Sequence, residues 1–211
     1  MRLFGHRFSI RPLFWVIWIL GCASYLFNLL ENLLNTDSWI LAGVLLGVMV
    51  VSMFWHEIGH ILFHRMFGAR TLDTVFGAYG GRTKSDASLS RFQNVIVYIA
   101  GPVFSLILAL GVFIFSLIQP MEGFLWQESI KLAILFNVLW GIVNLVPILP
   151  LDGGKLMVGF YPGTKKFLTI FGLLLAILTT TFCILSGRWA GAFLFAVIAY
   201  VNINLLFGRE V

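Results

Sequence analysis

Charged residues are scarce in this 211-residue chain. Lys, Arg, Asp and Glu make up only 11% of the sequence, whereas 60% is hydrophobic, and the mean hydropathy is +0.97. A soluble domain needs more polar surface than this composition provides, so the soluble globular class is excluded. The composition instead predicts an integral membrane protein.

Cysteine is almost absent as well. Only Cys22 and Cys183 occur, and both fall within apolar stretches, where a free cysteine behaves as a small hydrophobic residue. Neither a disulfide framework nor a thiolate metal site is expected. Internal repeats, low-complexity tracts and long linkers are also lacking, so residues 1–211 are expected to form a single domain.

Six uncharged stretches each reach the roughly 18 to 20 residues that a helix needs to cross a bilayer. They run from Leu13 to Leu30, Ser38 to Trp55, Phe92 to Met121, Leu132 to Leu151, Phe167 to Gly187 and Trp189 to Gly208. In the third stretch, Pro120 predicts that the helix stops before that residue. The expected fold is an all-α integral membrane protein with six transmembrane helices.

The basic residues predict the orientation in the membrane. Short loops rich in Lys and Arg tend to stay in the cytoplasm. With six spans, only Lys131 and Arg188 of the 14 basic residues lie on the side opposite the two termini. Both termini are therefore expected in the cytoplasm. The net charge of +5 is explained by this topology and by attraction to the lipid bilayer, and nucleic-acid binding is not expected.

The segment 71–83, between the second and third stretches, combines β-branched and aromatic residues with three glycines. This pattern predicts a short β-hairpin-like loop on the cytoplasmic side. An exposed strand edge here could hold an extended substrate by β-addition. An ordinary cytoplasmic loop would explain the segment equally well.

The pentapeptide HEIGH, residues 56–60, ends the second apolar stretch. His56 and His60 are four residues apart, so on a helix they lie on one face and can bind one metal ion together. Glu57 then lies beside the ion, where it can take a proton from a water molecule that the metal acidifies. Ionisable side chains inside a membrane helix are costly without a partner, and zinc is the partner that this pattern indicates.

HEIGH supplies only two ligands. His64 continues the four-residue spacing, but it lies roughly 12 Å along the helix from His56, too far to share a tetrahedral site, so it is interpreted as an interfacial histidine. Asp152 is the better candidate, because it is the only acidic residue between Lys131 and Glu210 and follows a stretch broken by two prolines. Without HEIGH, the Asp-Gly-Gly sequence would be interpreted as a cytoplasmic turn.

These two motifs resemble those of the site-2 protease family of intramembrane zinc metalloproteases. That family carries HExxH on one membrane helix and NxxPxxPLDGG on a later one, and both match here without a mismatch, the second at residues 144–154. Within the family, the chain looks most like the bacterial branch that contains the stage IV sporulation protease, without that branch's C-terminal nucleotide-binding domain. The resemblance covers Pro12 to about Gly208.

The resemblance implies a zinc-dependent intramembrane endopeptidase of the bacterial inner membrane, acting on membrane-embedded or membrane-apposed proteins near the cytoplasmic face. It implies that His56, His60 and Asp152 bind one zinc ion. It further implies that Glu57 activates water and that Asn144 contacts the substrate backbone or the forming oxyanion. Control is expected from a separate regulatory membrane protein, from substrate availability or from opening between helices.

Two polar residues receive minor roles in this interpretation. Ser105 stands three residues after a Gly-Pro pair, where family members often carry asparagine, so close helix packing together with Gly101 is preferred for it. His6, in the basic N-terminal tail, is expected to be incidental.

A zinc or proton transporter is the main alternative, because intramembrane His and carboxylate residues also mark ion pathways. A transport path needs sites spread across the membrane, and the other apolar stretches hold almost no ionisable residue. A catalytically silent scaffold is a third class. It is disfavoured because the predicted ligands and the base are all present.

Overall fold

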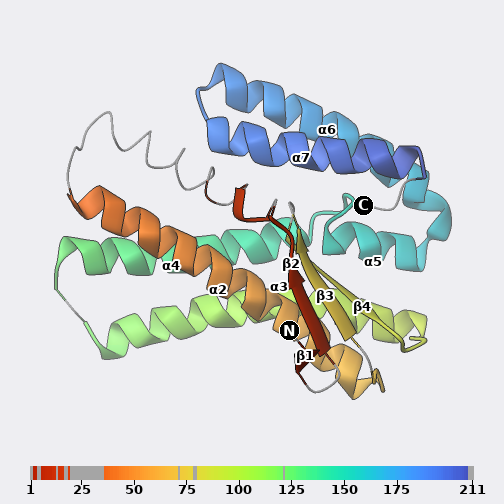
Figure 1. Ribbon diagram of the computed structural model, residues 1–211, viewed down its shortest axis with the longest axis horizontal. Helices are drawn as coiled ribbons and strands as arrows, with labels where there is room; N and C mark the ends of the chain where they lie inside the picture. The colour runs from red at the N-terminus through yellow and green to blue at the C-terminus, as the bar shows by residue number, and fades with distance from the viewer. Residues whose placement is uncertain are drawn as a thin grey trace.

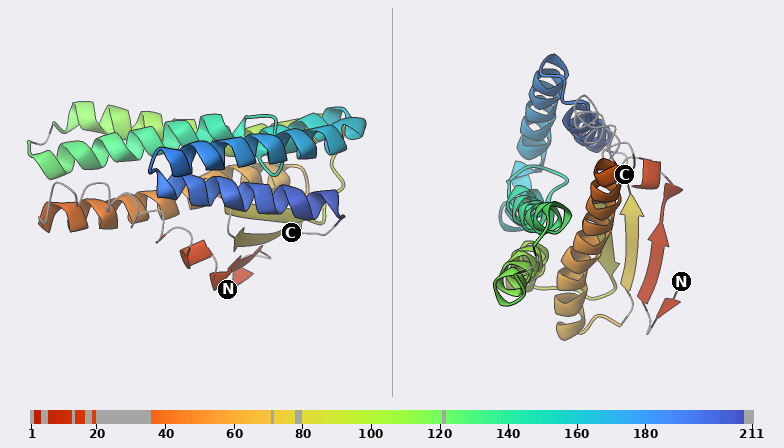
Figure 2. Two further views of the ribbon diagram at one scale, coloured as in Figure 1. Left: turned by 90° about the horizontal axis from the view of Figure 1, so that it is seen from above. Right: turned by 90° about the vertical axis from the view of Figure 1, so that its left-hand side faces the viewer.

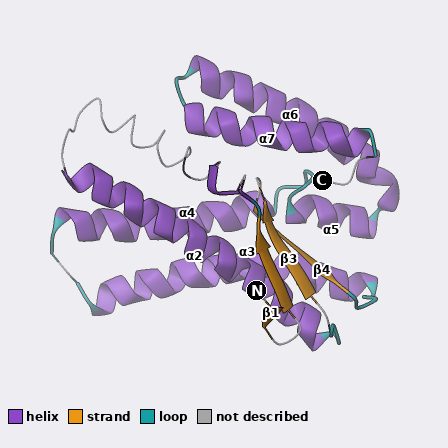
Figure 3. Cartoon of the chain, viewed as in Figure 1, coloured by secondary structure: helices purple, strands orange, loops and turns teal. Residues whose placement is uncertain are grey.

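The computed structural model describes residues 2–3, 6–12, 14–16, 19, 36–70, 72–77, 80–120 and 122–208. In chain order its elements are β1 (Arg2–Leu3), β2 (His6–Ile10), α2 (Thr36–Met66), β3 (Leu72–Gly77), β4 (Gly80–Ser85), α3 (Arg91–Ile118), α4 (Phe124–Asn144), α5 (Asp152–Phe160), a 3-10 turn (Pro162–Thr164), α6 (Lys165–Leu185) and α7 (Trp189–Leu206). The fold is therefore mostly helical, with one small sheet (Figure 1, Figure 3).

Three helices in the described residues are long and apolar enough to cross a membrane. They are Trp39–Met66, Arg91–Ile118 and Pro162–Leu185. The last helix contributes a shorter apolar segment, Gly191–Leu206, and α4 carries Glu128 and Lys131 in its first half. The first predicted span, from Leu13 to Leu30, lies largely outside the described residues. The structure thus supports three of the six predicted spans, and the rest stay a prediction.

The ends of α3 follow from local chemistry. Ser90 accepts a hydrogen bond from the backbone N–H of Gln93, and the Gln93 side chain accepts one from the backbone N–H of Ser90, which is a capping box. The helix ends at Ile118, because Pro120 cannot continue the helical hydrogen bonding. The predicted stop before Pro120 is confirmed.

The helices form two groups. Helices α2, α3 and α4 pack against one another, whereas α6 packs mainly against α7 (Figure 1, Figure 2). Asn202 of α7, which is fully buried, donates a hydrogen bond to the carbonyl oxygen of Leu149 at 2.7 Å. This bond ties the second group to the segment between α4 and α5.

The sheet has the strand order β1-β2-β3-β4, with β2 parallel to β3 and β4 antiparallel to β3. The predicted hairpin is confirmed as β3 and β4. The two N-terminal strands are a correction to the expected fold, because the tail pairs with β3 through a contact more than 60 residues away in the chain. The expectation that His6 is incidental is also wrong: it is buried and lies 3.0 Å from the hydroxyl of Thr74.

Apolar side chains join the sheet to the helix that carries HEIGH. Phe14, Met53 and Phe76 form a buried cluster, on which Phe8 and Phe54 also pack. The ring centroids of Phe54 and Phe76 lie 4.3 Å apart. Burial of aromatic side chains is the main source of stability for such a contact. The cluster fixes the sheet against α2 one turn before His56.

Gly59 allows α2 to approach α3 closely. A methyl group at this position would lie 2.7 Å from the carbonyl oxygen of Ala100. We predict that Gly59→Ala lowers the free energy of unfolding by about 1–3 kcal/mol, because the two helices must move apart. Thermal unfolding in detergent measures the effect.

The matched control is Gly47→Ala on the same helix, where an added methyl meets nothing within 4 Å. It should leave stability unchanged or raise it by up to about 1 kcal/mol, since alanine has the higher helix propensity. Equal melting temperatures for the two variants would contradict the predicted role of Gly59.

Candidate metal centre

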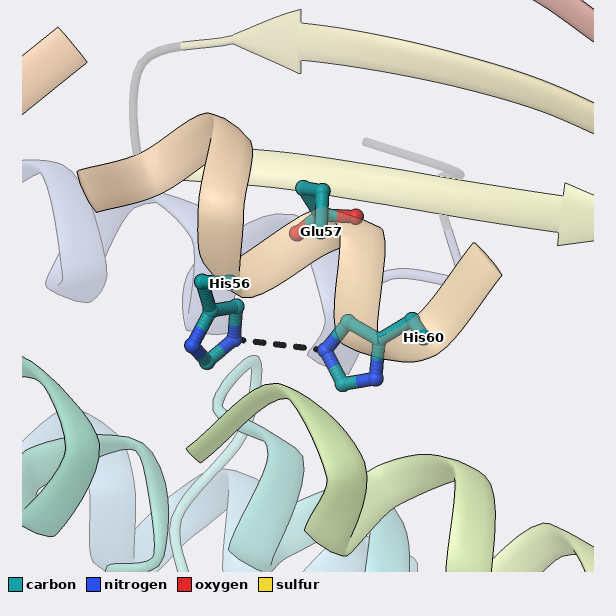
Figure 4. Close-up of side chains that lie close together, drawn as sticks. All are labelled: His56, Glu57 and His60. Atoms are coloured by element: carbon teal, nitrogen blue, oxygen red, sulfur yellow. Dashed lines mark hydrogen bonds between the residues drawn. The ribbon is translucent and has the colours of Figure 1, made fainter. Parts of the chain in front are cut away.

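Helix α2 presents the three ionisable residues of HEIGH on two sides. His56 and His60 point toward α3 and the segment before α5, whereas Glu57 points toward the strands (Figure 4). All three are buried, and only 4% of Glu57 is exposed. One potential ligand atom from each lies within 4.8 Å of the other two, so the group could hold a metal ion.

Asp152 completes a triangle of donor atoms with the two histidines. Its Oδ2 lies 3.1 Å from Nε2 of His56 and 3.2 Å from Nε2 of His60, and the two Nε2 atoms are 3.2 Å apart. Ligand atoms about 2.0–2.1 Å from a tetrahedral zinc ion lie about 3.3–3.4 Å from one another. The triangle therefore fits one face of a tetrahedral metal site.

Hydrogen bonds at Nδ1 direct the other ring nitrogens toward this triangle. Nδ1 of His60 lies 2.7 Å from the carbonyl oxygen of Val97. That oxygen can only accept, so Nδ1 carries the hydrogen and Nε2 of the neutral ring keeps its lone pair. A metal ligand needs this lone pair.

Ser105 orients the second histidine. Its Oγ lies 3.0 Å from Nδ1 of His56 and 3.4 Å from the carbonyl oxygen of Gly101. If the hydroxyl donates to that carbonyl, it accepts from Nδ1, which leaves Nε2 of His56 free to bind a metal. Ser105 is fully buried. Its hydrogen bond adds to the packing role that the sequence predicts.

Gly101 leaves the space in which the donors converge. A methyl group at this position would overlap Nε2 of His60 and lie 2.7 Å from Nε2 of His56. The predicted close packing of this glycine is thus packing against the two histidines. The absence of a side chain at Gly101 is consistent with a metal ion that reaches the donor atoms from the adjoining space.

The broken segment between α4 and α5 brings Asp152 to the histidines. Prolines 147 and 150 interrupt helical hydrogen bonding, and α5 begins at Asp152 itself. A methyl on Gly153 would overlap the carbonyl oxygen of Leu145, and one on Gly154 would overlap the carbonyl group of Ile148. The two glycines therefore let the first turn of α5 lie directly against the preceding segment.

Lys155 belongs to the site, although the sequence pattern assigns it only to membrane orientation. Its Nζ donates to Oδ1 of Asp152 at 2.8 Å. This bond holds one carboxylate oxygen and turns the other toward the histidines. The signal that could have identified Lys155 is its spacing, three residues after an aspartate at the start of a helix.

A cavity of 330 Å³ adjoins these residues, and Glu57, Asn144 and Asp152 are among those that line it. Nδ2 of Asn144 donates to the carbonyl oxygen of Trp140 at 2.8 Å, so Asn144 lies at the cavity and outside the donor triangle. His64 is outside the metal-binding group among the described residues, as its distance along the helix predicts.

Known proteins resemble this chain in sequence and in fold. The family model described as Peptidase M50B-like matches residues 30–161, more than half of the chain. This chain belongs to the M50B family of peptidases, the site-2 proteases. The resemblance predicted from HEIGH and the Asp-Gly-Gly motif is confirmed. Family membership and the three long apolar helices make the chain an integral membrane protein.

The relatives of this M50B chain include bacterial proteins. A Synechocystis sp. protein provisionally named a zinc metalloprotease is 32% identical over 160 residues, which cover 74% of this chain and 41% of that protein. Stage IV sporulation protein FB of Bacillus subtilis is 26% identical over 203 residues, or 95% of this chain and 62% of its own length. The chain thus spans about half the length of these curated relatives.

A solved structure supports the fold of the M50B chain. The site-2 protease from Methanocaldococcus jannaschii superposes with a TM-score of 0.73, covering 100% of this chain and 94% of that one at 20% identity. The similarity extends through the helices and the sheet. It identifies the fold and, at this identity, the fold alone.

We predict that Gly101→Ala weakens zinc binding at least about tenfold, because the added methyl occupies the space between the two histidine nitrogens. The zinc content of the purified protein and titration with Zn²⁺ after chelation measure the effect. Gly111→Ala, on the same helix with nothing within 4 Å of the added methyl, is the matched control. Full zinc occupancy in Gly101→Ala would contradict the assigned metal position.

Proposed function

We propose that this protein is a zinc-dependent intramembrane endopeptidase. It hydrolyses peptide bonds of membrane-embedded or membrane-apposed protein substrates near the cytoplasmic face. The observation that carries the proposal is the triangle of donor atoms from His56, His60 and Asp152, with the buried carboxylate of Glu57 beside it. The name of a relative, a provisionally assigned zinc metalloprotease, agrees with it.

The three triangle residues would hold the zinc ion. Their donor set, two imidazole nitrogens and one carboxylate oxygen, is that of a catalytic zinc site with an open coordination position. Zinc, when bound, supplies Lewis-acid chemistry that acidifies water and polarises a carbonyl group. Lys155, Ser105 and the Val97 carbonyl keep the three side chains in place.

Glu57 is the proposed general base. Its Oε2 accepts a hydrogen bond from Thr83 at 2.8 Å, which leaves Oε1 to take the proton from the attacking water. The same oxygen then returns the proton to the nitrogen of the leaving amine. Because the carboxylate is buried, bulk water does not compete for this proton.

Asn144 is the proposed substrate contact. Its amide nitrogen carries two hydrogens, and the bond to Trp140 uses one of them. The second remains for the carbonyl oxygen of a substrate in the adjoining cavity, where negative charge develops during attack.

Strand β4 is the proposed docking edge for an extended substrate. It is one of the two outer strands of the sheet, and its residues Gly80, Gly81 and Arg82 line the same cavity as Glu57. A substrate strand that pairs with this edge would be unwound from a helix, which exposes its carbonyl groups to attack. A methyl on Gly81 would overlap the Glu57 carboxylate, so the glycine keeps the strand close to the base.

The bacterial inner membrane, with both termini in the cytoplasm, is the proposed location. The excess of basic residues on the side of the termini supports this orientation. The partners are then membrane-anchored or transmembrane protein substrates, the lipid bilayer and a separate regulatory membrane protein.

We predict that Glu57→Gln abolishes proteolysis and leaves one zinc ion bound, because the glutamine cannot accept the proton from water. Comparing membrane-protein fragments in cells that carry the wild type or this variant identifies the substrates, and purified proteins then test them directly. Glu128→Gln is the control, since Glu128 pairs with Lys131 on the surface of α4. Cleavage by purified Glu57→Gln, or zinc flux without cleavage in proteoliposomes of the wild type, would contradict the proposal.

We predict that Asn144→Ala lowers kcat roughly 10- to 100-fold with zinc content unchanged, because a donor to the developing oxyanion is lost. Asn204→Ala is a close control: the Asn204 side chain makes the same bond to the carbonyl four residues earlier, at 2.9 Å, but does not line the cavity. Equal kcat values for Asn144→Ala and Asn204→Ala would contradict a role of Asn144 in catalysis.

A further inference from the structure

A line of hydrogen bonds connects Glu57 to the N-terminal strand. Oγ1 of Thr83 donates to Oε2 of Glu57 at 2.8 Å, and the hydroxyls of Thr83 and Thr74 lie 2.7 Å apart. Oγ1 of Thr74 in turn lies 3.0 Å from Nε2 of His6. His6 is 5% exposed and Thr74 is 0% exposed. The line runs from β2 across β3 and β4 to α2, and Thr83 is its partly buried member.

The strand register holds these side chains in line. Thr74 and Thr83 are directly opposite in the antiparallel pair β3 and β4, a position where two threonines can hydrogen-bond. Thr74 is also opposite Phe8 of β2. The ring of His6 stacks on that of Phe8, with centroids 4.0 Å apart. The backbone of the sheet thus positions His6, Thr74 and Thr83, the three members of the line that lie on strands.

The direction of the hydrogen bonds follows from proton counting. An ionised Glu57 carboxylate can only accept, so the Thr83 hydroxyl donates to it. The single hydroxyl hydrogen of Thr83 is then used, and Thr74 must donate to Thr83. The oxygen of Thr74 is left to accept, which places a hydrogen on Nε2 of His6. Every donor points toward Glu57, and bonds in such a chain strengthen one another.

His6 stays uncharged in this arrangement. Burial, and secondarily the positive charge of Arg65, lower the pKa of His6 below its ordinary value. The ring is therefore neutral near pH 7 and carries one hydrogen, which the bond to Thr74 requires on Nε2. Each hydrogen-bond donor in the line, namely His6, Thr74 and Thr83, is therefore uncharged.

We propose that His6, Thr74 and Thr83 are positioning residues that orient the Glu57 carboxylate for proton transfer, so that the N-terminal strand is a working part of the active site. This inference rests on the proposed function. The line of hydrogen bonds holds Oε2 of Glu57 in place and thereby leaves Oε1 of Glu57 to accept the proton. A network that only stabilised the sheet would change unfolding but not the catalytic step of the folded enzyme.

Three variants remove single links with little change of shape. Thr83→Val and Thr74→Val each replace a hydroxyl by a methyl, and His6→Leu removes the ring donor. We expect kcat of Thr83→Val to fall roughly tenfold and that of the other two by about 3- to 10-fold, with KM and zinc content unchanged. Thr83→Ser, Thr74→Ser and His6→Gln restore a donor and should recover most of the lost kcat.

Double variants separate positioning from stability. Once Thr83 no longer donates to Glu57, the hydrogen bonds of Thr74 and His6 are no longer connected to the carboxylate. Thr74→Val should therefore cause no further loss of kcat in the Thr83→Val background. Ser9→Ala on the opposite face of β2 is the matched control and should keep wild-type kcat. Additive losses, or wild-type kcat in Thr83→Val and Thr74→Val, would overturn the proposal. If His6→Leu fails to fold, the comparisons of Thr83→Val with Thr83→Ser and of Thr74→Val with Thr74→Ser still test the proposal.

An infrared measurement tests the line of hydrogen bonds without the need for substrate cleavage. The carboxylate stretch of Glu57, identified by its loss in Glu57→Gln, should shift in Thr83→Val and return in Thr83→Ser, because a hydrogen bond to Oε2 is lost and regained. An unshifted carboxylate band in Thr83→Val would overturn the proposed line of hydrogen bonds. Cleavage by Glu57→Gln would instead overturn the proposed function, so the two failures are distinguishable.

Discussion

The structure depends on the cost of burying ionisable groups at membrane depth. His56, His60 and Asp152 come from two distant parts of the chain, yet their donor atoms meet at 3.1–3.2 Å with almost no exposure. Side chains of this kind remain in an apolar interior only when a cation or a full set of hydrogen bonds compensates them. The helices and the broken segment before α5 bring the three donor atoms together with hydrogen-bond partners from Val97, Ser105 and Lys155.

Glycines make the convergence possible because donor atoms can meet only where backbones nearly touch. Gly59 lets α2 reach α3, Gly101 clears the space beside the histidine nitrogens, and Gly153 lets α5 turn back on the preceding segment. In each case an added methyl would overlap or crowd a specific atom of the site or its support. By contrast, Gly43 and Gly47, earlier on α2, have nothing within 4 Å, so they play no part in bringing the donor atoms together.

The residues of the candidate metal site could be picked out from the sequence because their signals are local or unusual. Two histidines four residues apart share a helix face by geometry, and Asp152 stands out as the one acidic residue in a long apolar region. The strand β2 was not predictable in this way. Its five residues resemble a basic tail, and the contact between His6 and Thr74 joins positions 68 residues apart, which no local pattern reveals.

The two buried carboxylates differ in the charge of their partners, and this difference suits their proposed roles. Asp152 is held by the ammonium group of Lys155, a cation that stabilises the ionised form needed in a metal ligand. Glu57 is held by Thr83, a neutral donor. A cation at that place would fix the carboxylate equally well but would weaken it as a proton acceptor. A line of neutral hydrogen bonds that reaches back to the N-terminal strand orients the proposed base without a cation bonded to its carboxylate.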